Sequence, residues 1–234
     1  MVRPFPLPKQ DLGLKAMRVF GVLTGACLFL VLGACAPLEE TPRVRKTSRT
    51  FTTVVIDPGH GDHDSGARAR SGLLEKNVAL DIALRLAPKL QAAGFQTVLT
   101  RRSDVFIPLD RRSRISGQYE NAVFVSIHLN DCRRRVVNGV ESYYFSEESK
   151  RMAHVLVHTL AEGVHSPDRG PRVARFRVLR TNENPAVLME CGYMSSPREA
   201  ALLATAAYRE RVAESLARGI IRQRGGPLVR QALE

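Results

Sequence analysis

Three side chains of the types that bind zinc stand far apart along the chain: His60, Glu75 and His128. A hydrolytic zinc site needs about three nitrogen or oxygen ligands and an open position for water. His60 lies in a turn-prone stretch between two glycines, Glu75 begins a helical pattern, and His128 ends an apolar run. They form no local metal motif, so their spacing alone leaves the triad as a hypothesis.

Strand-like and helix-like segments alternate along the chain and must position these side chains. Runs of β-branched residues predict strands, and apolar residues at helical spacing predict helices. We expect strands at 51–57, 95–100, 122–128, 139–145, 175–180 and 186–190, and helices at 75–93, 109–119, 147–162, 197–204 and 208–223. Pro88 predicts an interruption or kink in the first helix. This order indicates a single α/β domain with a mostly parallel, twisted sheet and helices on both faces.

Polar clusters lie where the predicted strands end. Residues 57–60 follow the first strand, residues 128–130 follow the central one, and Glu190 ends the last one. In parallel sheets, loops at the carboxyl ends of the strands carry most functional residues. The sequence therefore predicts a functional site at this edge of the sheet.

Four motifs resemble those of a known enzyme family. They occupy residues 55–67 (VIDPGHG followed by DSGA), 75–77 (EKN), 126–130 (SIHLN) and 185–195 (PAVLMECGYMS). In this order they resemble the zinc-dependent N-acetylmuramoyl-L-alanine amidases, the type-3 amidase family, over residues 52–221. The resemblance implies that His60, Glu75 and His128 bind one Zn²⁺ ion and that Glu190 is the catalytic carboxylate.

The resemblance also implies a reaction, hydrolysis of the amide bond between N-acetylmuramic acid and L-alanine of the peptidoglycan stem peptide. Zinc lowers the pKa of bound water to roughly 7 and polarises a carbonyl group. Because an amine is a poor leaving group, a carboxylate must take the proton of the water and return it to the departing nitrogen. Glu190 is suited to both tasks, and the expected role is cell-wall remodelling or turnover.

The motifs depart from the family pattern at several positions. Asp62 and His63 follow Gly61, where the family usually has a second glycine, so His63 is either a substitute ligand or an exposed loop histidine. Leu129 and Tyr193 also differ from the usual residues and would change the shape of the pocket. The short segment 131–139 has no room for the helical insertion that blocks the zinc site in some members.

The first 35 residues predict export. Four basic residues precede an apolar run at 19–34, which is short for a membrane span of roughly 20 residues but suits a signal peptide. The run ends in Leu-Gly-Ala-Cys, which resembles the lipobox of bacterial lipoproteins, with Cys35 as the lipidated residue. A plain signal peptide is the alternative, and Cys27 fits the lipobox pattern less well.

These features divide the chain. We expect a lipoprotein signal peptide at 1–34, a tether at 35–50, the zinc amidase catalytic domain at 51–224 and a tail at 225–234. A lipid at Cys35 and a basic surface would together hold the protein on a membrane, facing the periplasm. Ala36, with no Asp after the cysteine, favours the outer membrane. We expect a monomer.

The charge is consistent with several partners. Thirty-five basic and 23 acidic residues give a formal charge of +12, which suits nucleic acid, a membrane surface or a cell-wall polymer. Export argues against nucleic acid, so peptidoglycan and the membrane are the expected partners. Two rival functions remain, a zinc peptidase that cuts within the stem peptide and a non-catalytic lipoprotein that binds peptidoglycan.

Three other clusters have open interpretations. Residues 133–135 are three arginines, which either contact substrate carboxylates through bidentate pairing or form a solvated charge run. His154 and His158 have the spacing of a metal pair on a helix, although a surface or core pair is the commoner case. Cys132 and Cys191 are either a disulfide or two separate thiols.

Overall fold

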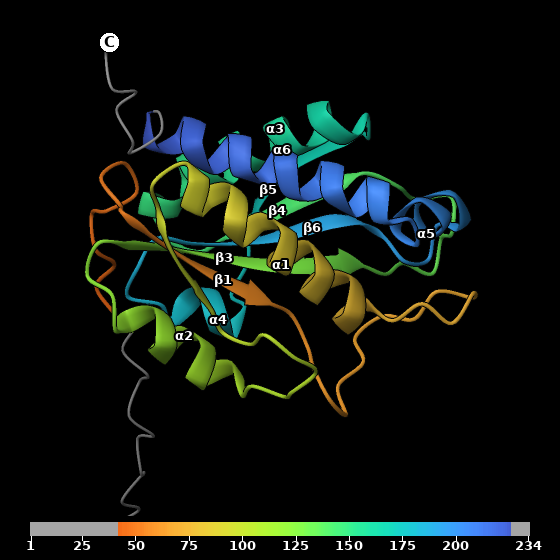
Figure 1. Cartoon of the computed structure of the whole chain (residues 1–234), viewed down its shortest axis with the longest axis horizontal. Coiled ribbons are helices and arrows are strands. Elements are labelled where there is room, and N and C mark those ends of the chain that lie inside the picture. The colour runs from red at the N-terminus through yellow and green to blue at the C-terminus, as the bar shows by residue number, and fades with distance from the viewer. Residues whose placement is uncertain (1–41, 226–234) are drawn as a thin grey trace, which may run out of the picture. The chain divides into compact units, whose positions relative to one another are not determined.

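A six-stranded sheet lies at the centre of residues 42–225, the part of the chain that this computed structural model describes (Figure 1). The strand order is β2-β1-β3-β6-β4-β5. All neighbouring strands are parallel except β4 and β6, which are antiparallel. The strands are β1 (Thr53–Pro58), β2 (Gln96–Leu99), β3 (Ala122–Asn130), β4 (Val140–Tyr144), β5 (Asp168–Val173) and β6 (Ala186–Tyr193).

Helices cover both faces of the sheet. One face carries α1 (Glu75–Ala92), α3 (Glu147–Val164) and α6 (Ala206–Arg224), and the other carries α2 (Leu109–Gly117) and α4 (Arg177–Arg180) (Figure 1). The short helix α5 (Pro197–Leu203) follows β6. The predicted single α/β domain with a mostly parallel sheet is therefore confirmed.

The alternation of side chains along the central strands fills two separate cores. In β1, Val54 and Ile56 belong to the larger core under α1, α3 and α6, whereas Val55 belongs to the smaller core under α2 and α4. Successive strand residues point to opposite faces, so a central strand covered on both sides must be apolar throughout. This explains the unbroken hydrophobic runs of β1 and β3.

The prediction for residues 175–180 was wrong. This segment contains the short helix α4, and the missing strand is β5, which pairs in parallel with the edge of β4. The residues of β5 are mostly exposed, and Gly170 and Pro171 lie within it. An exposed edge strand needs no apolar alternation, and its proline is tolerated there because one side of the strand has no ladder partner. The helix α1 is not interrupted at Pro88.

The last residues before β1 pack on the domain. The backbone N–H of Arg45 donates to the carbonyl oxygen of Glu183 at 2.8 Å, and the hydroxyl of Thr47, which is buried, donates to the carbonyl of Ala122 at 2.8 Å. The part of the predicted tether from Arg45 onward is therefore held against the domain. Cys35 and the predicted signal peptide lie outside the described residues, and no helix between 42 and 225 is long and apolar enough to cross a membrane.

The burial of Leu156 in the larger core leads to a prediction about stability. Leu156 on α3 is 0% exposed, whereas Leu84 on α1 is 42% exposed. We expect Leu156→Ala to lower the free energy of unfolding by about 2–5 kcal/mol, because it leaves a cavity between α3, α6 and the sheet. Urea titration followed by circular dichroism measures this, with Leu84→Ala as the matched control, for which a loss below about 1 kcal/mol is expected. Equal losses for the two variants would contradict the assignment of this core.

Candidate metal centre

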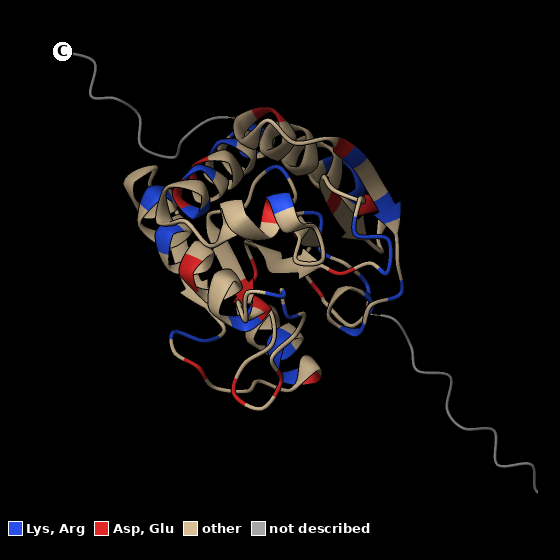
Figure 2. Ribbon diagram, turned by 90° about the vertical axis from the view of Figure 1, so that its right-hand side faces the viewer, with Lys and Arg blue, Asp and Glu red and all other residues tan. Residues whose placement is uncertain are grey.

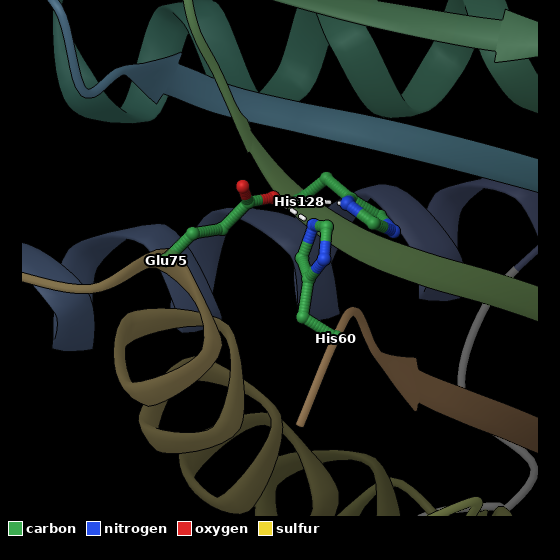
Figure 3. Close-up of side chains that lie close together, drawn as sticks. All are labelled: His60, Glu75 and His128. Atoms are coloured by element: carbon green, nitrogen blue, oxygen red, sulfur yellow. Dashed lines mark hydrogen bonds and ion pairs between the residues drawn. The ribbon is translucent and has the colours of Figure 1, made fainter. Parts of the chain in front are cut away.

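Three residues from separate elements converge at the carboxyl ends of β1 and β3. His60 lies in the loop after β1, Glu75 is the first residue of α1, and His128 lies on β3 (Figure 3). The same oxygen of Glu75, Oε1, lies 3.0 Å from Nε2 of His60 and 2.9 Å from Nδ1 of His128. The structure thus brings together the three residues that the sequence singled out as a ligand set.

The donor set fits a divalent metal such as zinc. One ligand atom from each side chain lies within 4.8 Å of the other two, and two imidazoles with one carboxylate are a known set for catalytic zinc. Burial by itself would raise the pKa of Glu75, but hydrogen bonds from His128 and His60 outweigh it and hold the pKa well below its usual range. The carboxylate is therefore in the ionised form that a metal requires.

Backbone groups from the loop before α1 and from the end of β3 fix the Glu75 carboxylate. The N–H of Ala67 donates to Oε2 at 2.7 Å, and the N–H of Leu129 donates to Oε1 at 3.0 Å. Gly66 has a φ of +61° and lies so close that an added Cβ would be 2.5 Å from Oε2. A second carboxylate, Asp64, lies 2.9 Å from Nδ1 of His60, whereas Nε2 of the same ring faces Glu75.

Two buried arginines, which the sequence reasoning missed, hold the loop of His60. Arg101 donates to the carbonyl oxygens of Pro58 at 3.0 Å and Gly59 at 2.7 Å. Arg112 donates to the carbonyls of Pro58 at 2.7 Å and His60 at 2.8 Å. Both arginines are only 2% exposed. Arginine is rarely so buried, and neither residue carries a sequence signal that separates it from the many surface arginines.

The charge of Arg112 is balanced by a buried carboxylate. Its Nη1 lies 2.9 Å from Oδ1 of Asp57 at the end of β1. Asp57 also accepts hydrogen bonds from the hydroxyls of Thr100 at 2.6 Å and Ser126 at 2.8 Å. This network joins α2 and β3 to β1 and to the residue that follows β2, so the edge that carries the site is cross-linked by polar contacts.

Glu190 lies beside the triad, on β6. It is the register partner of His128 on β3, so the two side chains leave the sheet on the same face. Burial raises the pKa of Glu190 well above its usual range, and the carboxylates of Glu75 and Glu141 add to the effect. Its Oε2 has no hydrogen-bond partner among the described residues. A carboxyl group in this position can accept and return a proton.

A pocket of about 280 Å³ opens in front of these groups, on the face of the sheet covered by α2 and α4. Its polar wall contains His60, His128 and Glu190. Its apolar wall comes from α2, α4 and the loops that precede these two helices: Phe106, Leu109, Phe176 and Val178. Three of the four apolar residues are exposed, which indicates a wall available to a ligand.

The remaining candidate residues lie apart from the triad. His63 has a side chain that is 69% exposed and packs against Phe106, so it has the features of the exposed loop histidine. His158 contacts Glu162 and Asp168, and no second group of possible metal ligands occurs within residues 42–225. Cys132 and Cys191 are free thiols.

Comparison with known proteins assigns the family. The family model described as N-acetylmuramoyl-L-alanine amidase matches residues 54–222. This range includes the triad of His60, Glu75 and His128, and it includes Glu190. The chain belongs to the N-acetylmuramoyl-L-alanine amidase family. The amidase LytC of Bacillus subtilis is 38% identical over 216 residues, covering 91% of this chain and 43% of the relative. The cell wall amidase LytH of Staphylococcus epidermidis, named as probable, is 34% identical over 170 residues. This chain therefore spans about half the length of these curated relatives.

Solved amidases have the same fold. AmiC2 of Nostoc punctiforme is 44% identical with a TM-score of 0.70, covering 73% of this chain and 95% of that one. The catalytic domain of CwlV from Bacillus (Paenibacillus) polymyxa is 38% identical with a TM-score of 0.71, covering 74% and 97%. The amidase domain thus accounts for nearly all of each matched structure.

The close approach of Gly59 to His128 makes a prediction about metal binding. A Cβ on Gly59 would lie 2.3 Å from Cε1 and 2.5 Å from Nε2 of His128. We expect Gly59→Ala to weaken Zn²⁺ binding at least tenfold, because the imidazole must leave its place beside Glu75. Equilibrium dialysis with Zn²⁺ measures this. Gly117→Ala, whose Cβ would be 3.6 Å from Glu183, is the control. Unchanged affinity in Gly59→Ala would show that His128 is not a ligand in this position.

Proposed function

We propose that this protein is a zinc-dependent N-acetylmuramoyl-L-alanine amidase, which hydrolyses the amide between N-acetylmuramic acid and L-alanine in the peptidoglycan stem peptide. The observation that carries the proposal is the convergence of His60, Glu75 and His128 beside Glu190 in one pocket. Family membership and the names of relatives such as LytC support the substrate and the bond.

The residues of the site have separate roles in the proposed reaction. His60, Glu75 and His128 would hold one Zn²⁺ ion, which supplies a Lewis acid that lowers the pKa of water and polarises the scissile carbonyl. Glu190 takes a proton from the attacking water at its unpartnered Oε2. It then gives that proton to the alanine nitrogen as the carbon–nitrogen bond breaks. The first products are a free muramyl carboxylic acid and a free peptide amine, and transfer of the acid proton to the amine gives the carboxylate and the ammonium, so atoms and charges balance.

Product identification tests the proposal. The full chain, loaded with Zn²⁺, is incubated with a defined disaccharide-peptide, and mass spectrometry identifies the fragments. We expect intact disaccharide and intact stem peptide. For Glu190→Gln we expect kcat to fall by about 10²–10⁴-fold with Zn²⁺ still bound, because the amide cannot relay the proton. His63→Gln, an exposed control in the neighbouring loop, should retain its activity.

Two outcomes would contradict the proposal. Fragments cut within the peptide would make the protein a zinc peptidase. A folded, zinc-loaded chain that binds the disaccharide-peptide without cleaving it would be a peptidoglycan-binding lipoprotein.

We further propose that the protein is exported and anchored by a lipid at Cys35, facing the periplasm from the outer membrane, as a monomer. The lipobox-like sequence supports the anchor, and the positive charge supports the membrane location because a basic surface adds an electrostatic contribution to the lipid's. The ten residue steps from Cys35 to Arg45 span at most about 35 Å. The domain would therefore act on peptidoglycan close to the membrane.

Fractionation of cells that express the full chain tests the anchor. We expect the protein in the membrane fraction and labelled by a fatty-acid probe. Cys35→Ser should move it to the soluble fraction and abolish the label, since the acceptor thiol is lost. Cys27→Ser is the control and should leave both unchanged. Label that persists in Cys35→Ser would place the lipid elsewhere, and absence of label in all three proteins would indicate a plain signal peptide.

A further inference from the structure

A basic hollow lies on the other side of the candidate metal centre from the pocket. Its volume is about 400 Å³, and we call it the arginine hollow. Four arginines line it: Arg68, Arg70, Arg133 and Arg135. The other lining residues are Asp131, Cys132, Met194 and Ser195. The hollow shares no lining residue with the pocket. Figure 2 faces the end toward which β1 and β3 run, and it shows Lys and Arg on several loops there.

The four arginines have no carboxylate partner in the described part of the chain. No ion pair within 4.0 Å joins any of them to an Asp or Glu of residues 42–225, although Asp131 lies in the same wall. Other arginines of the domain are paired, for example Arg85 with Asp81 and Arg209 with Asp81. Four unneutralised guanidinium groups around one concavity create a positive potential that attracts an anionic ligand.

The two loops that carry these arginines leave directly from the metal centre. Arg68 follows Ala67, whose N–H donates to Glu75. Arg133 stands four residues after Leu129, whose N–H donates to the other oxygen of Glu75. At 3.3–3.6 Å per residue, the Cα of Arg133 is at most about 14 Å from that of Leu129. Arg68 and Arg133 are therefore only one and four residues along the chain from the backbone groups that hold Glu75.

The two concavities also lie on different faces of the sheet. The pocket is lined by Val178 and Leu188 of the smaller core, whereas the arginine hollow is lined by Met194 of the larger core. The pocket combines aromatic and aliphatic side chains with polar groups, and its two arginines, Arg112 and Arg177, are paired with Asp57 and Asp110, whereas the arginines of the hollow have no such partner among residues 42–225. A substrate that crosses the metal centre therefore meets two chemically different ends.

We propose that the arginine hollow binds the free carboxylates of the peptide half of the substrate, carried by the second and third residues beyond the scissile amide. This assignment rests on the proposed amidase function. An extended peptide places those residues roughly 7–11 Å beyond the amide, which is within the upper limit of about 14 Å between the Cα atoms of Leu129 and Arg133. Guanidinium groups bind carboxylates bidentately, and a carboxamide cannot replace that charge-assisted pairing. The sugar half then occupies the apolar pocket beside Phe106 and Phe176.

A pair of matched substrates tests this proposal. Both are muramoyl-peptides of the same sequence, one with free carboxylates on the second and third residues and one with carboxamides there. For the Zn²⁺-loaded full chain we expect kcat/KM to be about tenfold higher for the acid. Arg68→Gln and Arg133→Gln should each lower kcat/KM for the acid by about 3- to 20-fold, mainly through KM, and leave the amide unchanged.

Arg134→Gln is the matched control. It removes the same charge from the same exposed loop, but Arg134 does not line the hollow. We expect a change below about twofold, since a surface charge at this distance acts only through screened electrostatics. Losses in Arg68→Gln and Arg133→Gln that equal the loss in Arg134→Gln, or that are the same for acid and amide, would overturn the proposal.

A binding measurement separates this proposal from the amidase function. Calorimetry with the free stem peptide, as acid or as amide, needs no cleavage. Tighter binding of the acid that is lost in Arg133→Gln and kept in Arg134→Gln supports the arginine hollow even if the chain cuts no substrate. Equal binding of both peptides overturns it. Inorganic phosphate that competes with the acid peptide at equal affinity would also overturn it, because the hollow would then be a general anion site.

Discussion

The buried carboxylate of Glu75 is the interaction on which the rest of the site depends. Glu75 is only 3% exposed, and a buried charge is stable only when it is paired and fully hydrogen-bonded. Two imidazoles and two backbone N–H groups meet this requirement. Because one N–H group belongs to the loop before α1 and the other to the end of β3, the same carboxylate fixes the path of the chain on both sides of the centre.

The surroundings of this carboxylate are rigid for a second reason. The loop that carries His60 exposes carbonyl oxygens toward the protein interior, and Arg101 and Arg112 satisfy them. Arg112 would itself be an uncompensated charge without Asp57. The polar groups at the carboxyl edge of the sheet thus form a chain of contacts, in which the loop needs the two arginines and Arg112 needs Asp57. Such a connected network would hold the proposed ligands in place before a metal binds, which lowers the free-energy cost of forming the site.

The centre separates two environments. On the face of α2 and α4, a pocket combines exposed aromatic and aliphatic side chains with polar groups that include His60, His128 and Glu190. On the opposite face, arginines on two loops line a hollow without a neutralising partner among residues 42–225. A glycopeptide is equally asymmetric, with a sugar on one side of the scissile amide and an acidic peptide on the other. With the proposed function, this arrangement would orient such a substrate as well as supply a reaction centre.

The sequence by itself determined the class of fold, the buried central strands and the starts of the main helices. These features follow from local periodicity, because a strand covered on both faces must be apolar and a covering helix must be amphipathic. The motifs also singled out His60, Glu75, His128 and Glu190. Only the tertiary structure decided that β5 pairs with β4 and that Glu190 on β6 is the register partner of His128 on the neighbouring strand β3. It also decided that Arg101 and Arg112 are buried and bind the carbonyl groups of the loop that carries His60. Each of these features depends on contacts between residues far apart in the chain. A local sequence pattern does not indicate which distant residue a side chain or strand will contact.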